Sequence, residues 1–309
     1  MSSSADPESS GVFIWVQAFV AELERAGIEA IVYPSSTLGS EIVRSQQVLL
    51  GLLEVNVTGT QEIEIYSDLI AAFELPFLFS GNHEPDALFH HTDYRDALNR
   101  DTVPHGIRVA DLAMIGGMTG IFTARAPVET LEDVSSFRLR AMVSDQIDWV
   151  ESWGGSATKV AWEEVPQALQ TGIADGYINP PIVAYLFGHG GQLDYFTDLA
   201  IVPSVRVIVF SETWYQSLSP TERDAVDEAV VRARAANRNW VQQTVKSELA
   251  LLESIGIDVI QLSPPERDKF RAPLLSSYQT KVDPITLNTI NQYIRQARQH
   301  LLQSTDSEL

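Results

Sequence analysis

The chain has 309 residues, of which 45% are hydrophobic and 20% charged, a balance typical of a globular protein. Its net charge of −20 argues against nucleic-acid backbones and anionic membranes as partners, because both are themselves negative. Cysteine is absent, which excludes disulfides, thiolate metal ligands and cysteine nucleophiles. No apolar run approaches the roughly 20 residues of a membrane span.

The N-terminal half alternates predicted helices with predicted strands. Residues 1–10 lack the basic and apolar regions of a signal peptide, and we expect a loop-like leader there. Hydrophobic periodicity predicts helices over 12–25, 40–50 and 84–99, and strands over 28–34, 53–59 and 107–115. This alternation indicates an α/β protein with mainly parallel sheets.

The C-terminal half continues the pattern. Strands are expected over 120–127, 137–142, 157–162, 174–179 and 205–212, and helices over 144–155 and 163–172. Ser219-Pro220-Thr221-Glu222 combines an N-cap serine, a proline at the first helical position and a capping-box glutamate. An apolar stripe continues from there to Gly256, which predicts one helix of about 35 residues and roughly 50 Å. Such a helix is long enough to cross two lobes.

Common sequence motifs of catalytic, metal-binding and nucleotide-binding sites are missing. The six histidines show no metal-ligand spacing, and no nucleophile elbow, P-loop or GxGxxG sequence occurs. Glu163 and Glu164 are adjacent and do not converge, so we interpret them as favourable charge in the first turn of a helix. We therefore expect no cofactor, no metal site and no catalytic constellation.

The segment FRLRAM, residues 137–142, alternates apolar and basic side chains. On a strand this repeat places Arg138 and Arg140 on one face, opposite Phe137 and Leu139. The alternation along a strand determines on which face of the sheet the two arginines lie, but not how deeply each is buried.

Four segments in order resemble the solute-binding proteins of tripartite ATP-independent periplasmic (TRAP) transporters, the dicarboxylate-binding-protein-like family. They are YPSSTLGSE (33–41), FELPFLF (73–79), LEDVSSFRLRAM (131–142) and GGSATKVAWEEVPQALQTGIADGYINPP (154–181). Each is weak alone, but their order and spacing together are specific. The resemblance covers about residues 12 to 260.

The resemblance implies an α/β, two-lobed periplasmic-binding-protein-like fold with a hinge and a long helix spanning both lobes. We expect lobe I to comprise 1–116 plus 206–255, with its first strand missing, and lobe II to comprise 117–205 plus 256–309 with the C-terminal helices. The implied function is capture of an organic acid anion in an interlobe cleft and delivery to the membrane permease subunits. We expect a periplasmic monomer, although this sequence shows no signal peptide.

The resemblance also implies ligand-binding residues. An arginine at the position of Arg140 holds the ligand carboxylate in that family, and a guanidinium fork suits this task. Arg138 is expected nearer the mouth of the cleft or outside it. The other implied positions are Asn179, Trp162, Tyr177, Thr58, Gly59 and Thr60.

Whether a second cationic residue contacts a carboxylate of the ligand stays open. Many relatives carry a second arginine where this chain has Met118-Thr119, and Arg125 or Arg206 could replace it. Two alternative functions also stay open: an enzyme acting on an organic acid on the same scaffold, and a ligand-sensing module.

Overall fold

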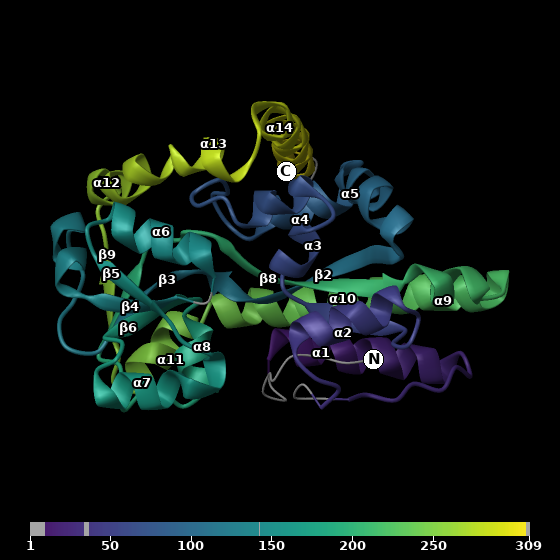
Figure 1. The fold of residues 1–309 in the computed structure, drawn as a ribbon, viewed down its shortest axis with the longest axis horizontal. Helices are drawn as coiled ribbons and strands as arrows, with labels where there is room; N and C mark the ends of the chain where they lie inside the picture. Colours follow the sequence, from purple (N-terminus) through teal and green to yellow (C-terminus); the bar gives the residue numbers. More distant parts are fainter. Residues whose placement is uncertain (1–9, 34–36, 142, 307–309) are drawn as a thin grey trace.

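The computed structural model describes residues 10–33, 37–141 and 143–306, which form two α/β lobes side by side (Figure 1). The two-lobed fold predicted from the resemblance is therefore confirmed. Of the predicted leader, only Ser10 lies within the described residues, where its hydroxyl caps the first helix by accepting from Phe13 N–H.

Lobe I is built on a three-stranded sheet in the order β1-β8-β2. Side chains of β8 alternate between two apolar cores on opposite faces, with Val207 and Val209 in one and Ile208 and Phe210 in the other. The elements of this lobe are α1 (Gly11–Arg25), α2 (Glu41–Leu49), β1 (Val55–Thr58), α3 (Gln61–Glu64), η1 (Asp68–Phe73), α4 (His83–His90), α5 (Tyr94–Thr102), η2 (Val103–His105), β2 (Ile107–Met118), β8 (Pro203–Ser211), α9 (Glu212–Ser217) and α10 (Pro220–Val245).

Lobe II is built on a six-stranded sheet in the order β5-β4-β6-β3-β7-β9. It too has a core on each face, with Leu139 and Ile178 in one and Phe122 and Tyr177 in the other. Its elements are β3 (Gly120–Thr123), η3 (Leu131–Ser136), β4 (Arg138–Ala141), α6 (Ser144–Ser152), β5 (Ser156–Lys159), η4 (Trp162–Glu164), α7 (Val165–Thr171), β6 (Gly176–Asn179), α8 (Ile182–Leu186), β7 (Tyr195–Asp198), α11 (Glu248–Ser254), β9 (Asp258–Gln261) and α12 (Pro264–Leu274).

The lobe I sheet is antiparallel and the lobe II sheet is mixed, so the prediction of mainly parallel pairing is wrong. Strand β8 pairs with both β1 and β2 in antiparallel fashion. In lobe II, β4 is parallel to β5 and β6, and β7 to β9, whereas β3 is antiparallel to β6 and β7. The cause is that the chain crosses between the lobes along extended segments instead of returning through a helix after every strand.

The strand predicted over 28–34 is not formed in the described residues. Only Tyr33 makes an isolated bridge, although Ile28, Ala30 and Val32 all pack against the core beneath α1. The alternation of apolar residues therefore indicates that one face of the segment is buried. A β-strand also needs backbone hydrogen bonds to a neighbouring strand.

Two predicted helices are each divided in two by a residue with a hydroxyl group. The helix over 84–99 is α4 and α5, separated at Thr92, whose hydroxyl donates to Leu88 O and accepts from Tyr94 N–H. The 35-residue helix is α10 and α11, separated at Ser247, whose hydroxyl donates to the carbonyls of the preceding turn. Side-chain hydroxyls compete in this way with the backbone pattern of a helix.

Four segments join the lobes within the described chain: Thr119 between β2 and β3, residues 199–202 between β7 and β8, residues 246–247 between α10 and α11, and the C-terminal segment that follows α12. The first two run together, because Thr119 N–H donates to Val202 O at 2.9 Å and Thr119 O accepts from Ile201 N–H at 2.9 Å. Two non-glycine residues here, Phe77 and Ala200, have φ of 60° and 48°. Left-handed backbone of this kind is strained, so the strain is concentrated where the lobes meet.

The C-terminal segment crosses from one lobe to the other (Figure 1). Helix α12 packs on lobe II, and α14 (Pro284–Asp306) packs on α4 of lobe I. Between them lies α13 (Ser277–Lys281), where Lys281 Nζ is 2.7 Å from Glu74 of lobe I and 2.6 Å from Asp145 of lobe II. The lobe boundaries given above stay a prediction.

Candidate ligand-binding site

Arg140 lies on β4, between β5 and β6 of the lobe II sheet. Its neighbour two residues earlier, Arg138, is exposed, whereas the Arg140 side chain is only 3% exposed. Leu139 points into the core on one face of the sheet, so Arg140 points to the other face, where its strand partner is Tyr177. The expected difference in depth between the two arginines is confirmed.

The Arg140 guanidinium forms no ion pair in the described part of the chain, and the Glu163 carboxylate acts on it only at longer range. Its Nε–H donates to Val160 O at 2.9 Å, and its central carbon lies 5.5 Å from the centre of the Trp162 ring. Burial lowers the pKa of Arg140 to about 10, which leaves the group charged at neutral pH. The remaining N–H donors of a buried cation of this kind favour an anionic ligand.

A cluster of aromatic side chains lies next to Arg140. The fully buried Tyr177 has its hydroxyl 2.9 Å from His189 Nδ1, and Trp162 contacts both rings, with centroids 6.0 and 5.5 Å away. Burial raises the pKa of Tyr177 and lowers the pKa of His189, so both are neutral at pH 7. These side chains add a low-dielectric wall without adding charge, which strengthens any ion pair made by Arg140.

His189 is a site residue that sequence reasoning missed. No sequence motif includes it, and no residue spacing connects positions 177 and 189. Its role follows only from the tertiary contact with Tyr177, whose orientation it holds.

Asn179 completes the lobe II part of the site. It lies two residues after Tyr177 on β6, hence on the same face of the sheet. Its buried Nδ2 has no hydrogen-bond partner among the described residues. A buried amide donor is costly unless it is satisfied, so this atom is available to a ligand oxygen. Of the predicted positions, the structure brings together Arg140, Trp162, Tyr177 and Asn179.

The other predicted positions belong to lobe I. Thr58, Gly59 and Thr60 follow one another at the end of β1, just before α3. The Thr58 side chain is fully buried, and its hydroxyl has no hydrogen-bond partner among the described residues. In that part of the chain no hydrogen bond or ion pair links these residues to Arg140, so their contact with the same ligand stays a prediction.

Lobe I also contains a charged cluster that the sequence did not reveal. The buried Arg44 of α2 donates through Nε to Asn56 Oδ1 at 3.1 Å, and Arg206 Nη2 lies 2.9 Å from Glu41 Oε1. Arg206 is therefore already neutralised by a carboxylate. Arg125, the other proposed second anion contact, is 70% exposed and pairs with Asp175 at 3.2 Å.

Two general features of the described residues bear on the class of site. They contain no group of three or more histidine or acidic side chains placed to hold a metal ion. None of the helices in these residues has the length and apolar character needed to cross a membrane.

Comparison with known proteins agrees with this geometry. The model of the family "Bacterial extracellular solute-binding protein, family 7" matches residues 2–283. The sialic acid-binding periplasmic protein SiaP of Vibrio cholerae is 25% identical over 260 residues, which cover 84% of this chain and 79% of SiaP.

Solved TRAP periplasmic solute-binding proteins share the whole fold. One from Chromohalobacter salexigens superposes with a TM-score of 0.86 at 20% identity, covering 96% of this chain and 99% of the other. One from Xanthobacter autotrophicus Py2 gives a TM-score of 0.85 at 23% identity, covering 95% and 98%.

The two-lobed fold and the buried, unneutralised arginine define a solute-binding protein. The family match makes the assignment more specific: the chain belongs to family 7 of the bacterial extracellular solute-binding proteins, the binding proteins of TRAP transport. The resemblance noted in the sequence is thereby confirmed, and the members of this family bind solutes for transport.

Proposed function

We propose that this protein captures a small hydroxylated monocarboxylate between its lobes and delivers it to the membrane permease subunits of a TRAP transporter. The observation that carries the proposal is Arg140, a buried cation with no carboxylate partner in the described residues. A carboxylate ligand would supply the missing counter-ion and accept two parallel hydrogen bonds from the guanidinium.

Support for a single carboxylate comes from the pairing of the two arginines considered as a second anion contact. Arg206 and Arg125 are each within 3.2 Å of a carboxylate of the protein itself. The resemblance noted in the sequence implies that Met118-Thr119 stands where many relatives carry a second arginine. One unpaired cation therefore favours a ligand with one negative charge.

Support for hydroxyl groups on the ligand comes from unsatisfied polar atoms. Asn179 Nδ2 and Thr58 Oγ1 are buried and have no hydrogen-bond partner in the described chain. The related structures contain D-glucuronate, β-D-galacturonate and D-erythronate, each of which combines one carboxylate with several hydroxyls. A sugar acid of this kind matches both features of the site.

The segments that connect the lobes support a mechanism in which the lobes close around the ligand. Short connections and the C-terminal segment join the lobes, so a ligand that contacts both lobes favours the closed arrangement by its differential affinity. We propose that the protein acts as a monomer outside the inner membrane and releases its ligand chemically unchanged.

The ligand side of the proposal is tested by calorimetry on the full chain. D-Glucuronate, D-galacturonate and D-erythronate are compared with neutral D-glucose and with the dicarboxylate succinate. We expect saturable binding of at least one sugar acid, recovered unchanged by mass spectrometry, and none of glucose. Preference for succinate would overturn the assignment to monocarboxylates, and chemical conversion of the ligand would favour the enzyme alternative.

The protein side is tested with a matched pair of variants on one strand. Arg140→Ala removes the anchor and is expected to weaken sugar-acid binding by roughly 2–5 kcal/mol, about thirtyfold or more. Arg138→Ala deletes the same side chain from an exposed position and should change the affinity less than threefold. Equal affinities for the two variants would remove Arg140 from the site.

A further inference from the structure

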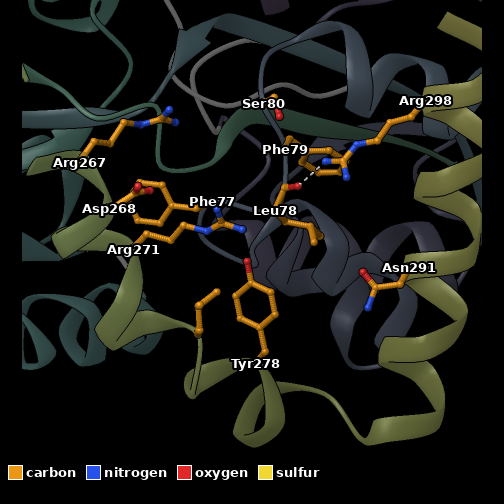
Figure 2. Close-up of a pocket in the computed structure, with 11 residues that line it drawn as sticks. Phe77, Leu78, Phe79, Ser80, Arg267, Asp268, Arg271, Tyr278, Asn291 and Arg298 are labelled. Carbon is orange, nitrogen blue, oxygen red and sulfur yellow. Dashed lines mark hydrogen bonds between the residues drawn. The ribbon is translucent and has the colours of Figure 1, made fainter. Parts of the chain in front are cut away.

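A cavity of about 380 Å³ lies where the C-terminal segment crosses between the lobes. One wall is α12 of lobe II, the opposite wall is α14, which packs on lobe I, and the 77–80 loop lies between them (Figure 2). Its lining contains no residue of the candidate ligand-binding site. The lining residues are Phe77, Leu78, Phe79, Ser80, Arg267, Asp268, Arg271, Leu275, Tyr278, Asn291 and Arg298.

Three arginines line this cavity, in a chain with 21 basic and 41 acidic residues. Figure 2 shows Arg271 extending from α12 and Arg298 extending from α14, with their guanidinium groups directed toward each other across the cavity. Arg267 lines the same wall as Arg271, one helical turn earlier. Basic groups gathered in this way contrast with the acidic character of the molecule as a whole.

The three guanidinium groups differ in how they are already engaged. Arg298 Nη2 lies 2.8 Å from Glu84 Oε2 and donates to Leu78 O at 3.0 Å. Arg267 donates to the carbonyls of Leu199 and Ala200 at 2.7 and 3.2 Å, and its charge acts on Asp198 without forming an ion pair in the described residues. Arg271 has no hydrogen bond or ion pair among the residues that the structure describes.

The balance of charge in the cavity is positive. Asp268 is the sole carboxylate that lines it within the described chain, against three arginines of which only Arg298 has a close carboxylate partner. The neutral side chains of Ser80 and Asn291 add further hydrogen-bonding groups to the lining. Fixed guanidinium forks of this kind match the planar or tetrahedral oxygens of carboxylate and phosphate.

We propose that this cavity is a second anion-binding site, in which Arg267 and Arg271 of one wall and Arg298 of the other hold a small oxyanion of the phosphate or carboxylate type. The site is separate from the one that contains Arg140, and it stands whether or not the proposed solute is correct. Its walls come from elements packed on different lobes, so a bound anion bridges them.

The test uses the full chain with Arg140→Ala, which removes the first anchor so that any anion binding belongs to the cavity. Inorganic phosphate and succinate are titrated separately by calorimetry in a dilute chloride-containing buffer. We expect saturable binding of at least one of them, and the comparison of the two distinguishes phosphate from carboxylate chemistry. Absence of saturable binding of both probes overturns the proposal.

The decisive variant adds Arg271→Gln to that background. Arg271 is exposed and without a partner in the described residues, so its loss leaves the fold intact, as circular dichroism would verify. We expect at least tenfold weaker anion binding. Arg295→Gln, an exposed arginine of α14 that does not line the cavity, is the matched control and should leave binding unchanged. Equal losses in the two variants would show a general charge effect and overturn the site.

Discussion

In lobe I the buried carboxylate of Asp111 lies beside His90 and two arginines, whereas in lobe II the buried groups Arg140 and Glu248 form no ion pair in the described residues. Asp111 lies 3.1 Å from His90 Nε2 and 3.2 Å from Arg234 Nε, and it accepts from Trp15 Nε1 at 2.8 Å. Burial alone would raise the pKa of Asp111, but His90 and the two arginines of α10 lower it to about 2.

Glu248 shows the opposite behaviour at the start of α11. Its side chain is 4% exposed, and Gly117 N–H donates to its Oε2 at 3.2 Å. Burial, with a smaller contribution from the charge of Asp198, raises the pKa of Glu248 to about 7. The comparison teaches that the buried charge of Asp111 is already used to hold lobe I together, whereas the buried charge of Arg140 in lobe II is left available to a ligand.

The largest effect is expected in lobe I, from Asp111→Asn. This change leaves Arg234, Arg238 and His90 around a neutral amide and should cost about 3–5 kcal/mol of unfolding free energy, measured by urea denaturation. Asp96→Asn, at an exposed position of α5, is the control and should stay within about 0.5 kcal/mol. A small effect of Asp111→Asn would mean that the lobe I network is not structural.

The next effect concerns the pH dependence caused by Glu248. The folded protein keeps this proton up to about pH 7, whereas the unfolded chain releases it near 4.5, so stability falls as pH rises between these values. Glu248→Gln should remove that loss and become more stable than the parent by up to ~3 kcal/mol at pH 8, with little difference below pH 4.5.

The control for Glu248 is Glu253→Gln, an exposed residue of the same helix. Its stability difference from the parent should not vary with pH over the same range. A difference between parent and Glu248→Gln that stays constant from pH 4 to pH 8 would contradict the assignment of a raised pKa.

Local features of the fold could be predicted from the sequence where short-range chemistry decides them. The capping box predicted at Ser219 is present, because Ser219 Oγ accepts from Glu222 N–H and Glu222 Oε2 accepts from Ser219 N–H at 2.8 Å. The depth of Arg140 could be predicted only because the family resemblance distinguished it from Arg138.

Features that depend on distant contacts could not be predicted. Asp111 meets Arg234 across 123 positions, and Glu248 meets Gly117 across 131, so no local pattern marks either carboxylate as buried. The break at Ser247 depends on a competition between one hydroxyl and the helix backbone, which apolar periodicity does not report. The pairing of Arg206 with Glu41 is equally invisible in the sequence.

The third effect tests the geometry of the anchor in lobe II. Arg140→Lys keeps the charge but replaces a rigid two-donor fork by a compact ammonium, and we expect about tenfold weaker sugar-acid binding, or ~1.4 kcal/mol. Arg138→Lys on the same strand is the control and should be neutral. Full affinity in Arg140→Lys would show that charge alone, without the fork, accounts for recognition.

The smallest effect is expected from Arg206→Gln in lobe I. This variant tests whether the paired arginine of lobe I is left out of ligand binding while the unpaired Arg140 of lobe II takes part in it. Because Glu41 already lies 2.9 Å from Arg206, removing this arginine should weaken sugar-acid binding less than threefold by calorimetry, below ~0.7 kcal/mol. Glu41→Gln releases the same guanidinium and should strengthen succinate binding more than sugar-acid binding, since only succinate has a second carboxylate. A tenfold loss in Arg206→Gln would mean that lobe I supplies an anchor of its own, and that its paired cations exchange partners when the ligand arrives.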